Sequence, residues 1–169
     1  QHWFLPTGQT RVNADEAIIL LNPYPTDSIV DLSFTTNQGT ETPQEFQGID
    51  VPSNGVVGLD IGSQLRRRSA IAATVSARTG SVVAYQTSWS SKPAAGSALV
   101  GTPAASSPLA DPAVPTQGNT VTLGAPSAGT SWVWPDGLAG NGIDEQYVIY
   151  NPGAQAANVR LSIGLQQGS

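Results

Sequence analysis

The stretch that decides the fold is VDLSFT, residues 30–35. Apolar and polar side chains alternate strictly along it: Val30, Asp31, Leu32, Ser33, Phe34 and Thr35. Successive side chains of a strand point to opposite faces of a sheet. This period of two therefore predicts an antiparallel strand with one buried face and one solvated face.

Other short segments with strand character follow the same logic as far as residue 90. They are 17–21, 57–61, 71–77 and 83–89. A further strand is expected to begin at Phe46 and to continue through Ile49 and Val51, with a bulge at Gly48 where the phase changes. The run 17–21 is apolar at every position, which favours a strand buried on both faces. Glycine and proline together make up 31 of the 169 residues, so many short strands joined by turns fit better than long helices. We expect six or seven strands in an all-β, immunoglobulin-like antiparallel β-sandwich.

Part of the sequence occurs twice. Residues 3–39 align with residues 132–168 without a gap, at an offset of 129, and twelve positions are identical. Asn22-Pro23 recurs as Asn151-Pro152, and the alternating pattern recurs at Val159, Leu161, Ile163 and Leu165. Self-similarity at a fixed offset indicates a repeated structural unit.

The repeat suggests three parts of the chain. Residues 1–90 are expected to form one β-sandwich unit, and 91–118 read as a linker or long loop rich in proline, alanine and serine. Residues 119–169 would begin a second unit with strands at 120–124, 146–150 and 159–165. So few strands cannot cover a hydrophobic face alone. We therefore expect this incomplete unit to pack on the first, for example by completing its sheet.

Composition excludes several classes of function. The net charge of −5 disfavours binding to nucleic acid. The absence of cysteine excludes disulfides and thiolate metal sites. No stretch is long and apolar enough for a membrane span, and no phosphate-binding or dinucleotide-binding motif is present, so no cofactor is expected. The run Arg66–Arg68 fits a solvated loop better than an anion site.

Two longer stretches resemble a known family. They are LGAPSAGTSWVWPDGLAGNGIDEQYVIYNPGAQAANVRLSI (123–163) and RRRSAIAATVSARTGSVVAYQTSW (66–89). They are similar to an uncharacterised actinobacterial family of secreted or envelope-associated β-sandwiches, marked by Trp-x-x-Pro-x-Gly and Asn-Pro motifs. The resemblance implies an extracellular or envelope-associated location and no established activity. No signal peptide precedes the first motif, so an exported protein is expected to be present here in mature form.

Two acidic pairs, at equivalent positions of the repeat, are candidate ligand-binding residues: Asp15, Glu16, Asp144 and Glu145. Adjacent residues of a strand face opposite ways, and Ca²⁺ needs six to eight oxygen ligands, so neither pair makes a metal site by itself. No catalytic residues are expected. A serine-protease-like triad would depend on the single histidine, His2, close to the chain terminus. A glycosidase would need two distant acids, such as Asp60 and Asp144, in one cleft.

Tryptophans are the other candidate ligand-binding residues. Trp3, Trp132 and Trp134 lie beside the two Pro-x-Gly turns and are either packing anchors or a sugar-stacking platform. The sequence therefore favours a non-catalytic interaction or spacer module of the cell envelope, with a protein or glycan as its partner. A carbohydrate-binding module is the alternative, and self-association through unpaired strand edges is a further possibility.

Overall fold

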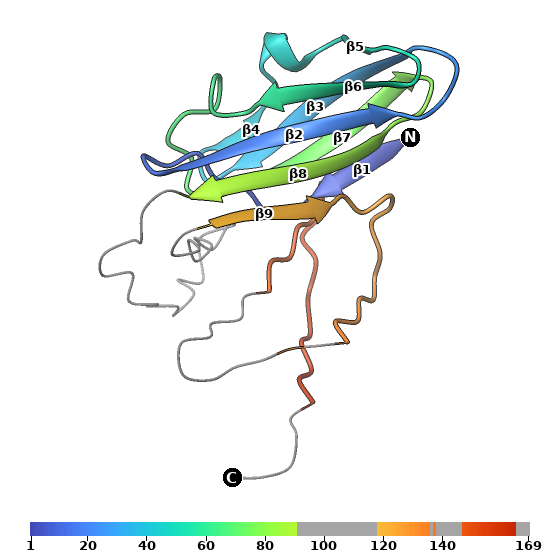
Figure 1. The fold of residues 1–169 in the computed structure, drawn as a ribbon. Helices are drawn as coiled ribbons and strands as arrows, with labels where there is room; N and C mark the ends of the chain where they lie inside the picture. Colours follow the sequence, from blue (N-terminus) through green and yellow to red (C-terminus); the bar gives the residue numbers. More distant parts are fainter. Residues whose placement is uncertain (91–117, 136, 138–146, 165–169) are drawn as a thin grey trace.

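The computed structural model describes residues 1–90, 118–135, 137 and 147–164. Two antiparallel sheets pack face to face, and the described residues contain no helix beyond one 3-10 turn (Figure 1). The predicted all-β sandwich is confirmed. The predicted linker lies outside the described residues except for Gly118, and so do Asp144 and Glu145.

Sheet A has five strands. It contains β1 (His2–Leu5), β7 (Ile71–Thr79), β3 (Ser28–Thr36), β4 (Gly39–Glu41) and β5 (Ile49–Val51). β7 lies between β1 and β3, while β4 and β5 pair with opposite ends of β3. The stretch 30–35 is thus the middle of a central strand, which explains its strict alternation.

Sheet B has four strands in the order β6 (Gly55–Asp60), β2 (Ala14–Asn22), β8 (Val83–Ser90) and β9 (Gly118–Leu123). All three pairings are antiparallel. β9 comes from beyond the predicted linker, so a segment assigned from sequence to the second unit extends the sheet of the first. Figure 1 shows β9 beside β8, at the edge of the sheet.

The hydrophobic core lies between the two sheets. Every second residue of β2 and β3 is buried, and Ile18, Leu20, Val30, Leu32 and Phe34 are fully buried. Leu5, Val75 and Ala84 complete this layer from β1, β7 and β8. Burying each large aliphatic side chain contributes about 1.5–3 kcal/mol, so the period of two in the sequence directly stabilises the sandwich.

The chain passes from one sheet to the other just after β9. The Gly124 amide donates to the Ala84 carbonyl over 3.0 Å, which continues sheet B. The next residue, Ala125, exchanges two backbone hydrogen bonds with Phe4 of β1, at 2.8 and 2.9 Å, which extends sheet A. This segment therefore ties the β8–β9 side of sheet B to the β1 edge of sheet A.

The predicted strand start at Phe46 is wrong. Residues Gln44–Phe46 form a 3-10 turn, in which the Phe46 amide donates to the Pro43 carbonyl. The turn places the Phe46 ring 5.5 Å from the Phe34 ring, in the core. Gly48 follows with a φ of +68°, a left-handed conformation that favours glycine, and β5 begins immediately after it.

The strands predicted at 146–150 and 159–165 are also not formed within the described residues 147–164. A strand requires a neighbour for its backbone amide and carbonyl groups. β9, the strand that precedes this segment in the sequence, pairs with β8 in sheet B, and no described strand pairs with residues 147–164. The second copy of the repeat therefore carries strand-like sequence in an extended, irregular backbone.

Candidate interaction surface

The outer face of sheet B is apolar. Cross-strand partners share a face of a sheet, and Leu21 is opposite Val56, while Ile19 is opposite Tyr85, which is itself opposite Leu123. The next row places Val121 opposite Thr87. The apolar part of the outer face of sheet B consists of Ile19, Leu21, Val56, Tyr85, Val121 and Leu123, and the polar residues Asp15, Asp60 and Asn119 lie at one end of the same face.

This face differs from the sequence prediction. The run 17–21 was expected to be buried on both sides, but Ile19 and Leu21 are only half-buried, and Val121 and Leu123 are 67% and 63% exposed. Figure 1 shows no described segment crossing the front of sheet B. A contiguous apolar patch of this kind on a soluble protein typically marks an interaction site.

The outer face of sheet A is different in character. Asp31, Ser33 and Thr35 of β3 point outward there, and so does Thr74 of β7. The Tyr150 hydroxyl lies 3.0 Å from the Thr74 hydroxyl and 3.5 Å from that of Thr35. A residue of the second copy is thus anchored on this polar face by hydrogen bonds.

One end of the sheet B face carries an aromatic ring between polar groups. Trp89 of β8 is 54% exposed, and its cross-strand partners are Asp15 on β2 and Asn119 on β9. Asn119 Oδ1 accepts a hydrogen bond of 2.8 Å from the Thr87 hydroxyl. Sequence reasoning missed Trp89 because only the β8–β9 pairing, a contact across more than 25 residues, brings Asn119 beside it.

The acidic pair of the first copy is split by the strand. Asp15 is exposed on the outer face, whereas Glu16 points inward and is almost completely buried. Burial raises the pKa of Glu16 well above its ordinary value, the nearby Asp15 raises it further, and a hydrogen bond from the Gln9 backbone amide opposes both. Burial therefore shifts Glu16 toward its neutral form and closes it off from ligands.

The loop from Thr7 to Arg11 covers this end of the sandwich. The Gln86 side-chain amide donates to the Thr7 carbonyl, and the Thr10 hydroxyl donates to the Leu65 carbonyl. Gly8 lies so close to Glu16 that an added Cβ would be 2.1 Å from Glu16 Oε2. The buried carboxyl group is thus enclosed by backbone.

The three candidate tryptophans have different environments. Trp3 is a packing anchor: it is 8% exposed, and its indole N–H donates to the Val82 carbonyl over 2.7 Å. Trp132 and Trp134 are about half exposed, and the Trp134 ring is 5.3 Å from the ring of Tyr147, edge to face. The candidate residues therefore do not gather into one site.

The second copy exposes side chains that the first copy buries. Val159 and Leu161 align with Val30 and Leu32, which have no exposed area, yet Val159 and Leu161 are 61% and 47% exposed. Ile163, which aligns with Phe34, is exposed as well. The segment 147–163 is therefore a second uncovered apolar surface.

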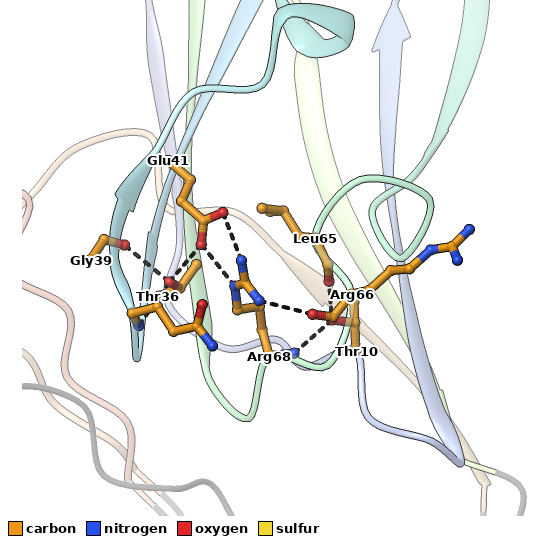
Figure 2. Close-up of polar contacts among 8 residues, drawn as sticks. Thr10, Thr36, Gly39, Glu41, Leu65, Arg66 and Arg68 are labelled. Atoms are coloured by element: carbon orange, nitrogen blue, oxygen red, sulfur yellow. Dashed lines mark hydrogen bonds and ion pairs between the residues drawn. The ribbon is translucent and has the colours of Figure 1, made fainter.

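The arginine run is a structural element. The Arg68 guanidinium makes a bidentate pair with the Glu41 carboxylate, with Nε and Nη2 at 2.8 and 2.9 Å from its oxygens (Figure 2). Glu41 also accepts a hydrogen bond from the Thr36 hydroxyl. Hydrogen bonds from Arg68 chiefly, and from Thr36, lower the pKa of Glu41, although partial burial opposes them. The pair ties the 61–70 loop to β4.

The described residues offer little for metal or acid–base chemistry. Over 1–90, 118–135, 137 and 147–164, no three His, Asp or Glu side chains gather as a metal site would require. Asp60 lies at the end of β6, and its oxygens accept hydrogen bonds from Ser63 of the following loop. In the same part of the chain, no helix has the length and apolarity needed to cross a membrane.

These features define a class: an antiparallel β-sandwich with one apolar and one polar outer face. A model of a family of unknown function, DUF5719, matches residues 1–169, and the chain belongs to that family. No curated protein matches it. The chain is similar to a solved structure, the crystal structure of Thermotoga maritima 1070, at 10% identity and a TM-score of 0.51, over 74% of this chain and 92% of that one. At this identity the likeness concerns the fold alone.

Proposed function

We propose that this chain is a non-catalytic interaction module of a secreted or envelope-associated protein, and that it binds a partner protein through the outer face of sheet B. The observation that carries the proposal is the apolar character of that face. An antiparallel sheet with one face on the core normally presents a polar face to water. Sheet A follows this rule and sheet B does not. The location rests on the sequence resemblance.

The proposal is tested by binding to isolated cell envelopes of the organism that encodes the chain. Val121→Asp places a charge on the β9 side of the apolar face and is expected to abolish co-sedimentation with the envelopes. Val12→Asp is the matched control, because Val12 is 84% exposed in a loop outside this face. Equal co-sedimentation of both variants would contradict the proposal.

A glycan partner is the second candidate, and one observation favours it. Trp89 offers an exposed ring, with a carboxylate and an amide on the neighbouring strands. Sugar rings stack on aromatic faces while their hydroxyl groups bind such polar groups. A glycan array separates the two candidates: binding that is lost in Trp89→Ala and kept in Trp132→Ala supports the glycan, and a flat array contradicts it.

A further inference from the structure

We propose that copies of this chain associate head to tail, with residues 147–163 of one copy packed on the outer face of sheet B of the next. The inference rests on the proposed function, since it uses the same face, and it names a second copy of the chain as an occupant. It accounts, with a single contact, for the two apolar surfaces that the described residues of the chain leave uncovered.

The segment repeats the sequence of β2 and β3, which lie in different sheets and whose inward side chains share the hydrophobic core. Its apolar positions Val159, Leu161 and Ile163 repeat those of β3, whose side chains are buried against β2 and β7. Its turn at Asn151 is built like the turn at Asn22. The segment therefore exposes three apolar side chains, Val159, Leu161 and Ile163, at the sequence spacing with which β3 packs on a sheet.

The anchor of the segment and the accepting face are on opposite sides of one molecule. Tyr150 anchors the segment on the outer face of sheet A, through Thr74 and Thr35. The accepting surface is the outer face of sheet B, and the hydrophobic core lies between the two sheets. Each copy thus presents one surface to each of two neighbours, which is a heterologous contact that forms rings or open chains.

Charge also favours this occupant. Asp15 and Asp60 lie at one end of the sheet B face, and the residues of that face include no lysine or arginine. The segment 147–163 carries a single charge, the positive Arg160. The contact therefore brings together surfaces of opposite charge, although the chain as a whole is negative.

The test uses two variants of the full chain, each lacking one surface. Leu161→Arg disables the segment, and Leu123→Arg disables the face. Both residues are exposed, so the melting temperature is expected to stay at the wild-type value in each variant. Val12→Arg is the control for an added surface charge outside both surfaces. Masses are measured by size-exclusion chromatography with light scattering.

We expect wild type and Val12→Arg to form assemblies that grow with protein concentration, and each single variant to be monomeric. An equal mixture of Leu161→Arg and Leu123→Arg is expected to form a one-to-one dimer, because each supplies the surface that the other lacks. A monomeric wild type, single variants that assemble like wild type, or a mixture that stays monomeric would each overturn the inference. A monomeric wild type that still binds envelopes through Val121 would overturn this inference alone and leave the proposed function standing.

Discussion

Asn22 and Asn151, separated by 129 residues, stabilise the turns that follow them with the same pair of hydrogen bonds. The Asn22 amide donates to the Thr26 carbonyl over 2.8 Å, and its oxygen accepts the Tyr24 amide over 3.0 Å. The Asn151 side chain bonds Gln155 and Gly153 in the same way, over 2.7 and 3.0 Å. The repeated sequence therefore produces the same local structure twice, once between two sheets and once in an exposed segment.

The two asparagines are expected to differ in their effect on stability. Asn22 is fully buried and also donates to the Val51 carbonyl, so Asn22→Ala leaves buried carbonyl groups without a donor. This loss costs about 1–3 kcal/mol of unfolding free energy. Asn151 is exposed, so Asn151→Ala is expected to change the free energy of unfolding by less than about 0.5 kcal/mol. Urea denaturation measures both, and equal effects would contradict the different roles assigned to them.

Glu16 is expected to make the sandwich less stable as pH rises. Its pKa is raised in the folded state, chiefly by burial, so its contribution to stability is fully present below the ordinary value of 4.5 and is lost as pH rises through the folded pKa. Glu16→Gln removes this dependence while keeping the size of the side chain. The melting temperature of the variant, relative to that of the wild type, should therefore increase as pH rises. A pH-independent difference would show that Glu16 is not buried as described.

The Arg68–Glu41 pair is expected to act in the opposite direction. The pKa of Glu41 is lowered in the folded state, chiefly by its hydrogen bond from Arg68, so its contribution is present above the ordinary value of 4.5 and is lost as pH falls through the folded pKa. Glu41→Gln is expected to cost about 1 kcal/mol at neutral pH, with the cost shrinking in acid. Denaturant titrations at neutral and acid pH measure this. Glu45→Gln, in the 3-10 turn, is the control.

Gly124 is expected to be essential for the passage of the chain between the sheets. A Cβ at this position would lie 3.1 Å from the Ala84 carbonyl and 3.1 Å from Leu5 Cδ2. Gly124→Ala should therefore destabilise the sandwich by about 1–3 kcal/mol through overpacking. Gly164→Ala is the control, because a Cβ there meets nothing within 4 Å. A Gly124→Ala protein as stable as the control would mean that β9 does not close the sandwich in this way.

The sequence predicted the sandwich well where burial follows a simple period. β3 alternates because one face meets the core, so its position could be read directly. The turn at Phe46 could not, because it depends on contacts with Pro43 and Phe34 rather than on the pattern. The pairing of β9 with β8 joins residues distant in sequence, and local patterns carry no record of it.

The candidate site was harder to predict for the same reason. Trp3 and Trp132 occupy equivalent positions of the repeat, but one is buried between sheets and the other is exposed. The run 17–21 did indicate an apolar outer face on sheet B, because its residues are apolar at odd and even positions alike. That pattern predicted burial on both faces of the strand, whereas the described residues bury only one face.

The most direct test of the central claim is hydroxyl-radical footprinting of the chain, free and bound to cell envelopes. Tyr85 and Trp89 of β8 report on the outer face of sheet B, and Tyr24 is an exposed reference in the turn that follows β2. We expect binding to protect Tyr85 and Trp89 from oxidation and to leave Tyr24 unchanged. Equal oxidation of Tyr85 and Trp89 in the free and bound chain would contradict the assignment of this face as the interaction surface.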